Sequence, residues 1–150
     1  MENHVFANQS ATIYTAYYLT QILIHRPFIR PPSHPLPNDG LQGHAHTTDD
    51  TLCPALDVCT NAAKSCARIV EKQLQRGLSN IPNLISVAHI CAAILLVNVW
   101  NLKAEEKAKS AEDVKPPLAQ TIEVLMNDVY IFMRALEGVG SRWESGTVYL

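Results

Sequence analysis

Apolar residues recur every three or four positions in four stretches of the chain, and this period predicts four α-helices. Three helices are expected over residues 8–25, 54–76 and 79–104. Only the last few residues of the chain could form a strand, so the expected fold class is all-α, a bundle of about four main helices. The fourth helix has the clearest apolar seam, with spacings of 4, 3, 4, 3 and 4: Leu118, Ile122, Leu125, Val129, Phe132 and Leu136.

Capping and breaking residues set the expected limits of the last two helices. The third helix is expected to begin in "SNIPN", where Ser79 or Asn80 can cap its first turn. The fourth is expected to begin near "VKPPLAQ" and to end at about Glu137, because Gly138 and Gly140 follow.

The third helix carries only one polar residue, His89, between Val87 and Val97. A helix that is apolar on nearly all sides is expected in the middle of a bundle. Its longest uninterrupted apolar run, Ile90 to Val97, is far shorter than the ~20 residues that a membrane span needs. We therefore expect no membrane contact.

A long irregular segment separates the first two helices. It contains five of the nine prolines together with two glycines and a cluster of Asn, Asp and Thr, in "RPFIRPPSHPLPNDGLQGHAHTTDDT". No helical or strand period continues through it. Residues 31–51 are therefore expected to form a flexible insertion loop within a single helical domain that spans residues 1–150.

Composition and charge exclude some classes of partner. The chain is 47% hydrophobic and 17% charged, and its net charge is −2. These values argue against a nucleic-acid interface, which needs clustered Lys and Arg. The first residues, "MENHVFANQS", lack the basic and apolar regions of a secretory signal, so we expect a reducing compartment and free thiols.

The cysteines are expected to act as small apolar residues. Cys59 and Cys66 lie seven positions apart with Ala63 between them, in the apolar stripe of the second helix. Two helical turns separate the thiols by roughly 10 Å. They cannot therefore both ligate one zinc ion, whose Zn–S bonds are about 2.3 Å long. We expect no metal or other cofactor in this chain.

Two histidine patterns admit a functional interpretation, and both favour a simpler one. "GHAHTTDD" holds His44, His46, Asp49 and Asp50, which could bind a metal, but the segment gives no sign of order. His89 could contact a ligand, although a lone imidazole in an apolar helix more often bonds a nearby carbonyl. No nucleophile, acid and base set is visible either, so we expect no enzyme.

The first helix ends in a basic pair and a breaker, His25, Arg26 and Pro27, followed by Phe28. Basic side chains at a helix C-terminus interact favourably with its negative end, by about 0.3–1 kcal/mol. Pro27 is expected to end the helix, and Phe28 and Ile29 can then fold back onto the core. These residues are expected to have a structural role.

Four segments in this order resemble the regulatory (middle homology) domain of fungal binuclear zinc-cluster transcription factors of the xylanolytic-activator type. "YYLTQILIHRPF" is similar to the family's helix that ends in His-Arg-Pro-Phe. "CTNAAKSCARIV" is similar to its Cys-x-x-Ala-Ala-x-x-Ile helix. "LISVAHICAAILLVNVW" and "TIEVLMNDVYIFMRALEGVGSRWESG" are similar to the two helices that follow.

The resemblance implies a nuclear protein that regulates transcription by RNA polymerase II. In that family, an N-terminal zinc cluster of six cysteines binds DNA, and no such cluster is present here. DNA and zinc binding are therefore expected of the full-length family and not of these residues. The chain looks like the C-terminal part of the regulatory domain, whose function implies contacts with protein partners or effectors.

A partial domain would leave apolar helix faces uncovered. We therefore expect protein partners or self-association, and we expect the third helix to be the most affected. An alternative function is a helical small-molecule sensor or carrier with an apolar pocket near His89, where His89 or Tyr17 would be the polar contact.

Overall fold

The computed structural model describes residues 2–29, 54–76, 81, 83–108 and 116–147. Within these ranges the chain is all-α and contains no strand, as the apolar period predicts. The predicted loop over residues 31–51 lies outside the described ranges. The elements are α1 (Glu2–His25), the short 3-10 helix η1 (Arg26–Phe28), α2 (Pro54–Gln75), α3 (Leu84–Ala108) and α4 (Pro116–Thr147).

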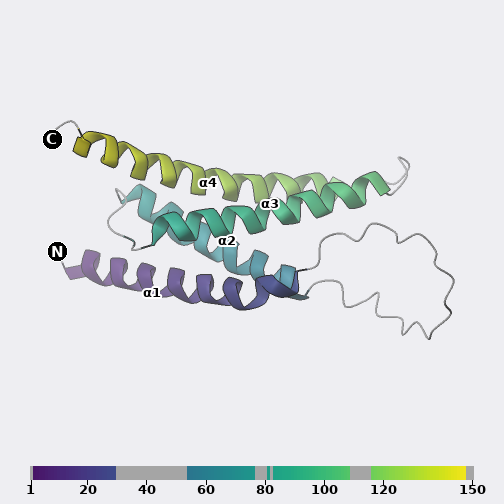
Figure 1. Cartoon of the computed structure of the whole chain (residues 1–150), viewed down its shortest axis with the longest axis horizontal. Helices are drawn as coiled ribbons and strands as arrows, with labels where there is room; N and C mark the ends of the chain where they lie inside the picture. Colours follow the sequence, from purple (N-terminus) through teal and green to yellow (C-terminus); the bar gives the residue numbers. More distant parts are fainter. Residues whose placement is uncertain (1, 30–53, 77–80, 82, 109–115, 148–150) are drawn as a thin grey trace.

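The four long helices lie side by side in a bundle (Figure 1). α2 and α3 each pack against all three of the other helices, α1 packs chiefly on α2, and α3 packs chiefly on α4. α1 and α4 make no direct contact and lie at opposite edges of the bundle.

The third helix was expected in the middle of the bundle, and α3 does contact all three other helices, although α2 shares this place. The buried face of α2 is rich in small residues, which let neighbouring helices approach closely, and it also includes Leu56 and Val70. α3 instead leaves one side open, where Ile85, Leu96 and Trp100 are exposed. The fully buried small residues of α2 are Cys59, Ala63, Cys66 and Ala67.

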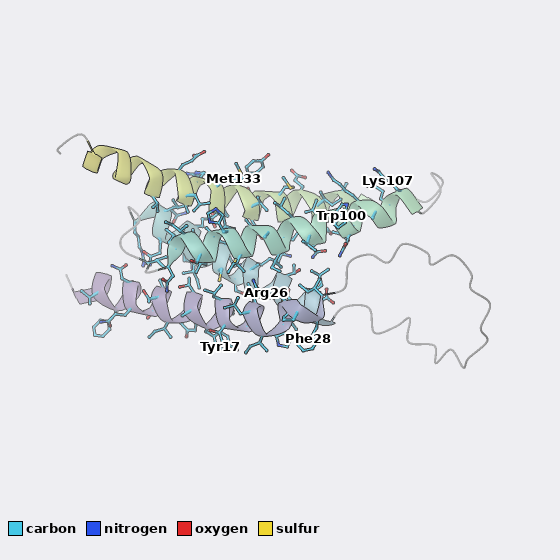
Figure 2. The ribbon with its side chains drawn as sticks, viewed as in Figure 1. Tyr17, Arg26, Phe28, Trp100, Lys107 and Met133 are labelled. Carbon is cyan, nitrogen blue, oxygen red and sulfur yellow. The ribbon has the colours of Figure 1, made fainter. Side chains whose placement is uncertain are left out.

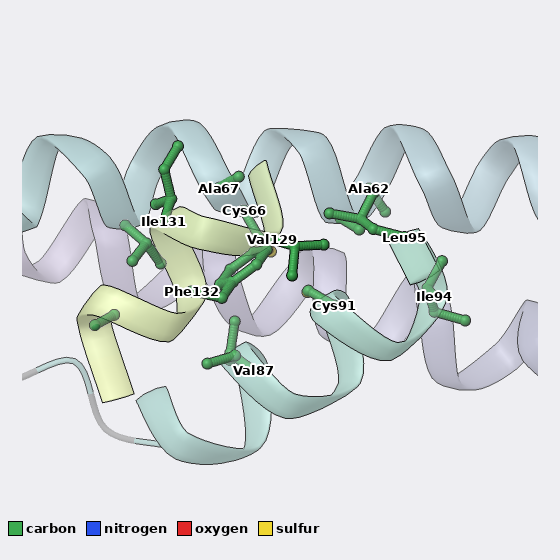
Figure 3. Packing of buried hydrophobic residues seen from close by; sticks show 14 of the residues in the cluster. Ala62, Cys66, Ala67, Val87, Cys91, Ile94, Leu95, Val129, Ile131 and Phe132 are labelled. Carbon is green, nitrogen blue, oxygen red and sulfur yellow. The ribbon is translucent and has the colours of Figure 1, made fainter. Parts of the chain in front are cut away.

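Larger side chains from the neighbouring helices fill the core around α2. Phe132 of α4 is fully buried, and Figure 3 shows its ring among Cys66 of α2 and Val87 and Cys91 of α3. Ile22 is the largest fully buried side chain that α1 contributes. The core is thus one continuous cluster to which all four helices contribute.

Three helix limits differ from those expected. α1 begins at Glu2, six residues earlier. α3 begins only at Leu84, after Asn83, whose φ of 64° lies in the left-handed region that Asn tolerates better than most residues. α4 continues through Gly138 and Gly140 to Thr147. A helical glycine costs only about 1 kcal/mol relative to alanine and keeps its backbone donor.

A 21-residue stretch of α3, Leu84–Ala104, is long and apolar enough to cross a membrane by those two criteria, with a mean hydropathy of 1.9. The run from Ile90 to Val97 is shorter than this stretch because it stops at the first polar residue on each side. Isolated polar residues barely lower the mean hydropathy of the longer stretch. A core helix of a soluble protein meets the same criteria, and α3 packs here on α2 and α4.

Exposed apolar residues are concentrated on α1, not on α3 as expected. Figure 2 shows Tyr17 and Phe28 on the side of α1 and η1 that faces away from the other helices. The large apolar residues exposed on α1 are Val5, Phe6, Ile13, Tyr14, Tyr17, Leu23 and Ile24.

Phe132 and Met133 are neighbours on α4 with opposite environments, one fully buried and the other exposed. We expect Phe132→Ala to lower the free energy of unfolding by about 3–5 kcal/mol, because it removes a core ring and leaves a cavity. Met133→Ala should change it by less than about 0.5 kcal/mol. Urea denaturation followed by circular dichroism measures both, and equal losses would contradict this core.

Candidate functional site

The His25–Phe28 segment turns the chain at the end of α1. α1 ends at His25, as the basic pair before Pro27 predicts, and one 3-10 turn follows. The Ile29 N–H donates to the Arg26 carbonyl at 3.1 Å, and Ile29 then adopts an extended conformation.

The side chains of this turn divide into two groups. Ile29 packs against the core, as expected, and His25 is half-buried. Phe28 does not fold back onto the core, because its side chain is 68% exposed. Arg26 and Pro27 are also exposed. The turn therefore exposes both a cation and an aromatic ring.

α1 and α2 pack together despite the 24 residues between them that the structure does not describe. The Cys59 thiol donates to the Ile22 carbonyl at 3.8 Å. Gln73 Nε2 donates to the Ala7 carbonyl at 3.5 Å, near the other end of the two helices. The helix that ends in His-Arg-Pro-Phe and the Cys-Ala-Ala helix therefore pack directly against each other.

Cys59, Ala63 and Cys66 are all fully buried, as their seam positions predict. Cys66 lies against Cys91 of α3, and both thiols are free. A hydrogen bond to Cys66 and burial raise the pKa of Cys91 far above its usual range. Burial also raises the pKa of Cys59. These two thiols are therefore poor nucleophiles and act as core residues.

A polar contact between α2 and α3 was not anticipated from the sequence. Asn98 Nδ2 donates to Thr60 Oγ1 at 2.9 Å, and Thr60 is buried. Gln73 of α2 is buried too, and its Oε1 accepts no hydrogen bond from the described part of the chain. Polar residues on an otherwise apolar helix face indicate that such a contact exists. Which of them pair depends on how the two helices are aligned, and the sequence does not show that alignment.

Asp128 of α4 is half-buried beside α2. Burial raises the pKa of its carboxyl group, and the charge of Glu71 acts in the same direction. Lys64 and Arg68 oppose this shift without reversing it. The carboxylate is therefore held in a position that disfavours its charge.

Neither proposed ligand contact lies inside the bundle. Tyr17 is exposed on α1, where its ring stacks edge-on against that of Tyr18 with centroids 5.2 Å apart. His89 is exposed on α3, and its Nδ1 is 2.9 Å from the Ile85 carbonyl. This is the carbonyl bond expected for a lone imidazole in a helix.

No three His, Cys, Asp or Glu side chains within the described ranges gather closely enough to hold a metal ion. His44, His46, Asp49 and Asp50 lie outside those ranges. The residues that the structure does place at the surface, Arg26 and the apolar residues of α1, favour contact with another macromolecule.

No family model matches the chain, and no curated protein or solved structure matches it.

The buried thiols lead to a labelling prediction in a Cys53→Ser background, which leaves only Cys59, Cys66 and Cys91. We expect iodoacetamide to alkylate none of the three in the folded protein and all of them in urea, as mass spectrometry can show. Ser86→Cys, at an exposed position on α3, should react at once and serves as the control. Rapid alkylation of the folded Cys53→Ser protein would contradict the burial.

Asp128 leads to a prediction about pH. Its pKa is higher in the folded state, so the folded protein binds more protons and the free energy of unfolding falls as pH rises through that window. Asp128→Asn should therefore be more stable than wild type at pH 7. The difference should vanish below the ordinary carboxyl pKa, about 3.9.

Thermal unfolding measured between pH 3 and pH 8 tests this expectation. Glu123→Gln, at an exposed position on the same helix, is the matched control and should leave the pH dependence unchanged. A less stable Asp128→Asn protein at pH 7 would mean that the attraction to Lys64 and Arg68 outweighs burial.

Proposed function

We propose that this chain is the regulatory segment of a fungal zinc-cluster transcription factor and modulates transcription by RNA polymerase II through protein contacts. The observation that carries the proposal is the pair of motifs in α1 and α2. The His25–Phe28 motif ends α1, and the Cys59-x-x-Ala62-Ala63 motif faces α1 across a buried seam.

The surface of α1 and η1 supports a role in protein contacts. Arg26 and Phe28 are both exposed on η1, where a cation and an aromatic ring can bind a carboxylate and an apolar side chain of a partner. The cysteines of the second motif line the core, so the motif acts through packing rather than through chemistry.

The proposal assigns DNA and zinc binding to the zinc cluster of the full-length family and not to these residues. It treats the chain as a nuclear regulatory part without catalysis and without a cofactor of its own. The sensor or carrier alternative gains no specific support, because Tyr17 and His89 are both exposed.

A reporter experiment tests the proposal. Residues 1–150 are inserted between a heterologous DNA-binding domain and an activation domain in yeast, and reporter transcription is compared with that of the fusion without the insert. We expect a change of at least about fivefold in either direction, the low end of ordinary coupling between sites. A change below about twofold at equal nuclear protein levels would contradict the proposal.

Arg26→Ala tests whether the turn contributes to that change. Lys107→Ala is the matched control, because it removes one exposed cation from α3, far from the turn (Figure 2). Only Arg26→Ala should reduce the effect on the reporter, and equal effects of the two variants would exclude the turn as a contact.

A further inference from the structure

The solvent-facing side of α1 carries a second apolar seam, opposite the one that faces α2. We call it the outer stripe. Its four large residues, Phe6, Ile13, Tyr17 and Ile24, are between 59% and 67% exposed. Ser10 and Thr20 fill the intervening positions and are also exposed. The spacing along the stripe is 4, 3, 4, 3 and 4, which is the period of a helix that packs on another helix.

This face is also free of charge. From residue 3 to residue 24, α1 contains no Asp, Glu, Lys or Arg. The other helices carry charged residues at exposed positions, for example Arg68 on α2, Lys103 on α3 and Glu123 on α4. Since a solvated helix face is ordinarily rich in charge, the outer stripe has the composition of a covered surface.

The stripe is symmetric about its midpoint, because the spacings 4, 3, 4, 3, 4 read the same in both directions. If two α1 helices pack antiparallel, Phe6 therefore meets Ile24 of the second copy, and Ile13 meets its Tyr17. Each aromatic ring faces an isoleucine. Ser10 meets Thr20, and these small residues let the two helices approach closely.

We propose that the outer stripe of α1 packs antiparallel against the same stripe of a second copy of this chain and forms a two-fold symmetric dimer. Such a contact is self-complementary, as a two-fold interface requires. The lack of charge means that no like charges meet along the seam. The proposal concerns the described residues alone and does not rest on the proposed function.

The area is sufficient for a stable dimer. Aromatic side chains carry about 150–250 Å² each, so the stripe with its flanking Tyr14 and Phe28 exposes roughly 600–700 Å² per copy. Two copies would bury more than the ~1,000 Å² expected of a specific interface.

Sedimentation equilibrium of the full chain tests the dimer. Wild type should have the mass of two chains at ~100 μM, whereas Ile13→Lys/Tyr17→Lys should raise the dimer dissociation constant at least about a hundredfold. Both positions are exposed, so the far-ultraviolet circular dichroism should not change. Tyr17→Ala is a milder variant that should weaken the dimer in the same direction.

The matched control is Leu96→Lys/Trp100→Lys, which introduces the same charges at exposed apolar positions of α3. It should remain dimeric. A monomeric wild type would overturn the proposal. This also holds if α1 of that monomer binds anionic vesicles or a different protein. Dissociation by the α3 variant and not by the α1 variant would place the interface elsewhere.

Disulfide trapping tests the antiparallel register in the Cys53→Ser background. Copies with Phe6→Cys and copies with Ile24→Cys are mixed and oxidised by air with copper phenanthroline. We expect a covalent dimer from the mixture and little from either variant alone. Efficient cross-linking of Phe6→Cys to itself would indicate parallel packing and would overturn the proposed register.

Discussion

The close approach of three helices to α2 is the constraint on which the rest of the bundle depends. The buried side of α2 is rich in alanine and cysteine, and these small side chains make the approach possible. With so little side-chain volume at the centre, the larger residues of the core have to come from the neighbours, such as Ile22, Leu95 and Phe132. A larger residue on this face of α2 would push several helices outwards at once, and overpacking of this kind typically costs about 1–3 kcal/mol.

The same arrangement explains why the surface is uneven. α2 is covered on three sides, so its charged residues are confined to the remaining edge, where Lys64, Arg68 and Glu71 lie near Asp128 of α4. α1 contacts the bundle mainly through α2 and turns most of its circumference outwards. Because α1 is apolar and uncharged, this position leaves more apolar surface exposed on α1 than on the other described helices.

Much of the fold could be predicted from the sequence because helical periodicity is a local property. The fold class, the end of α1 at His25 and the burial of Cys59, Ala63 and Cys66 all follow from spacing. That α2 shares the middle of the bundle with α3 could not be predicted, because hydrophobicity pointed to α3 alone. Gly138 and Gly140 wrongly predicted the end of α4. Leu136 and Val139 pack on the core and keep the chain helical past Gly138.

The candidate site was predicted in part for the same reason. The carbonyl bond of His89 is made within one helix turn and was anticipated. The exposure of Phe28 and Tyr17 depends on which side of α1 meets α2, and that orientation is a property of the assembled bundle.

The bond between Asn98 and Thr60 has a consequence for how this sequence can diverge. It helps to hold α2 and α3 in one relative register, because sliding either helix would leave the buried Thr60 hydroxyl without the half-buried Asn98 amide. Replacing Thr60 alone would leave the Asn98 amide without its acceptor, and replacing Asn98 alone would leave the Thr60 hydroxyl without its donor. Positions 60 and 98 should therefore covary, drifting together to an apolar pair or staying polar together.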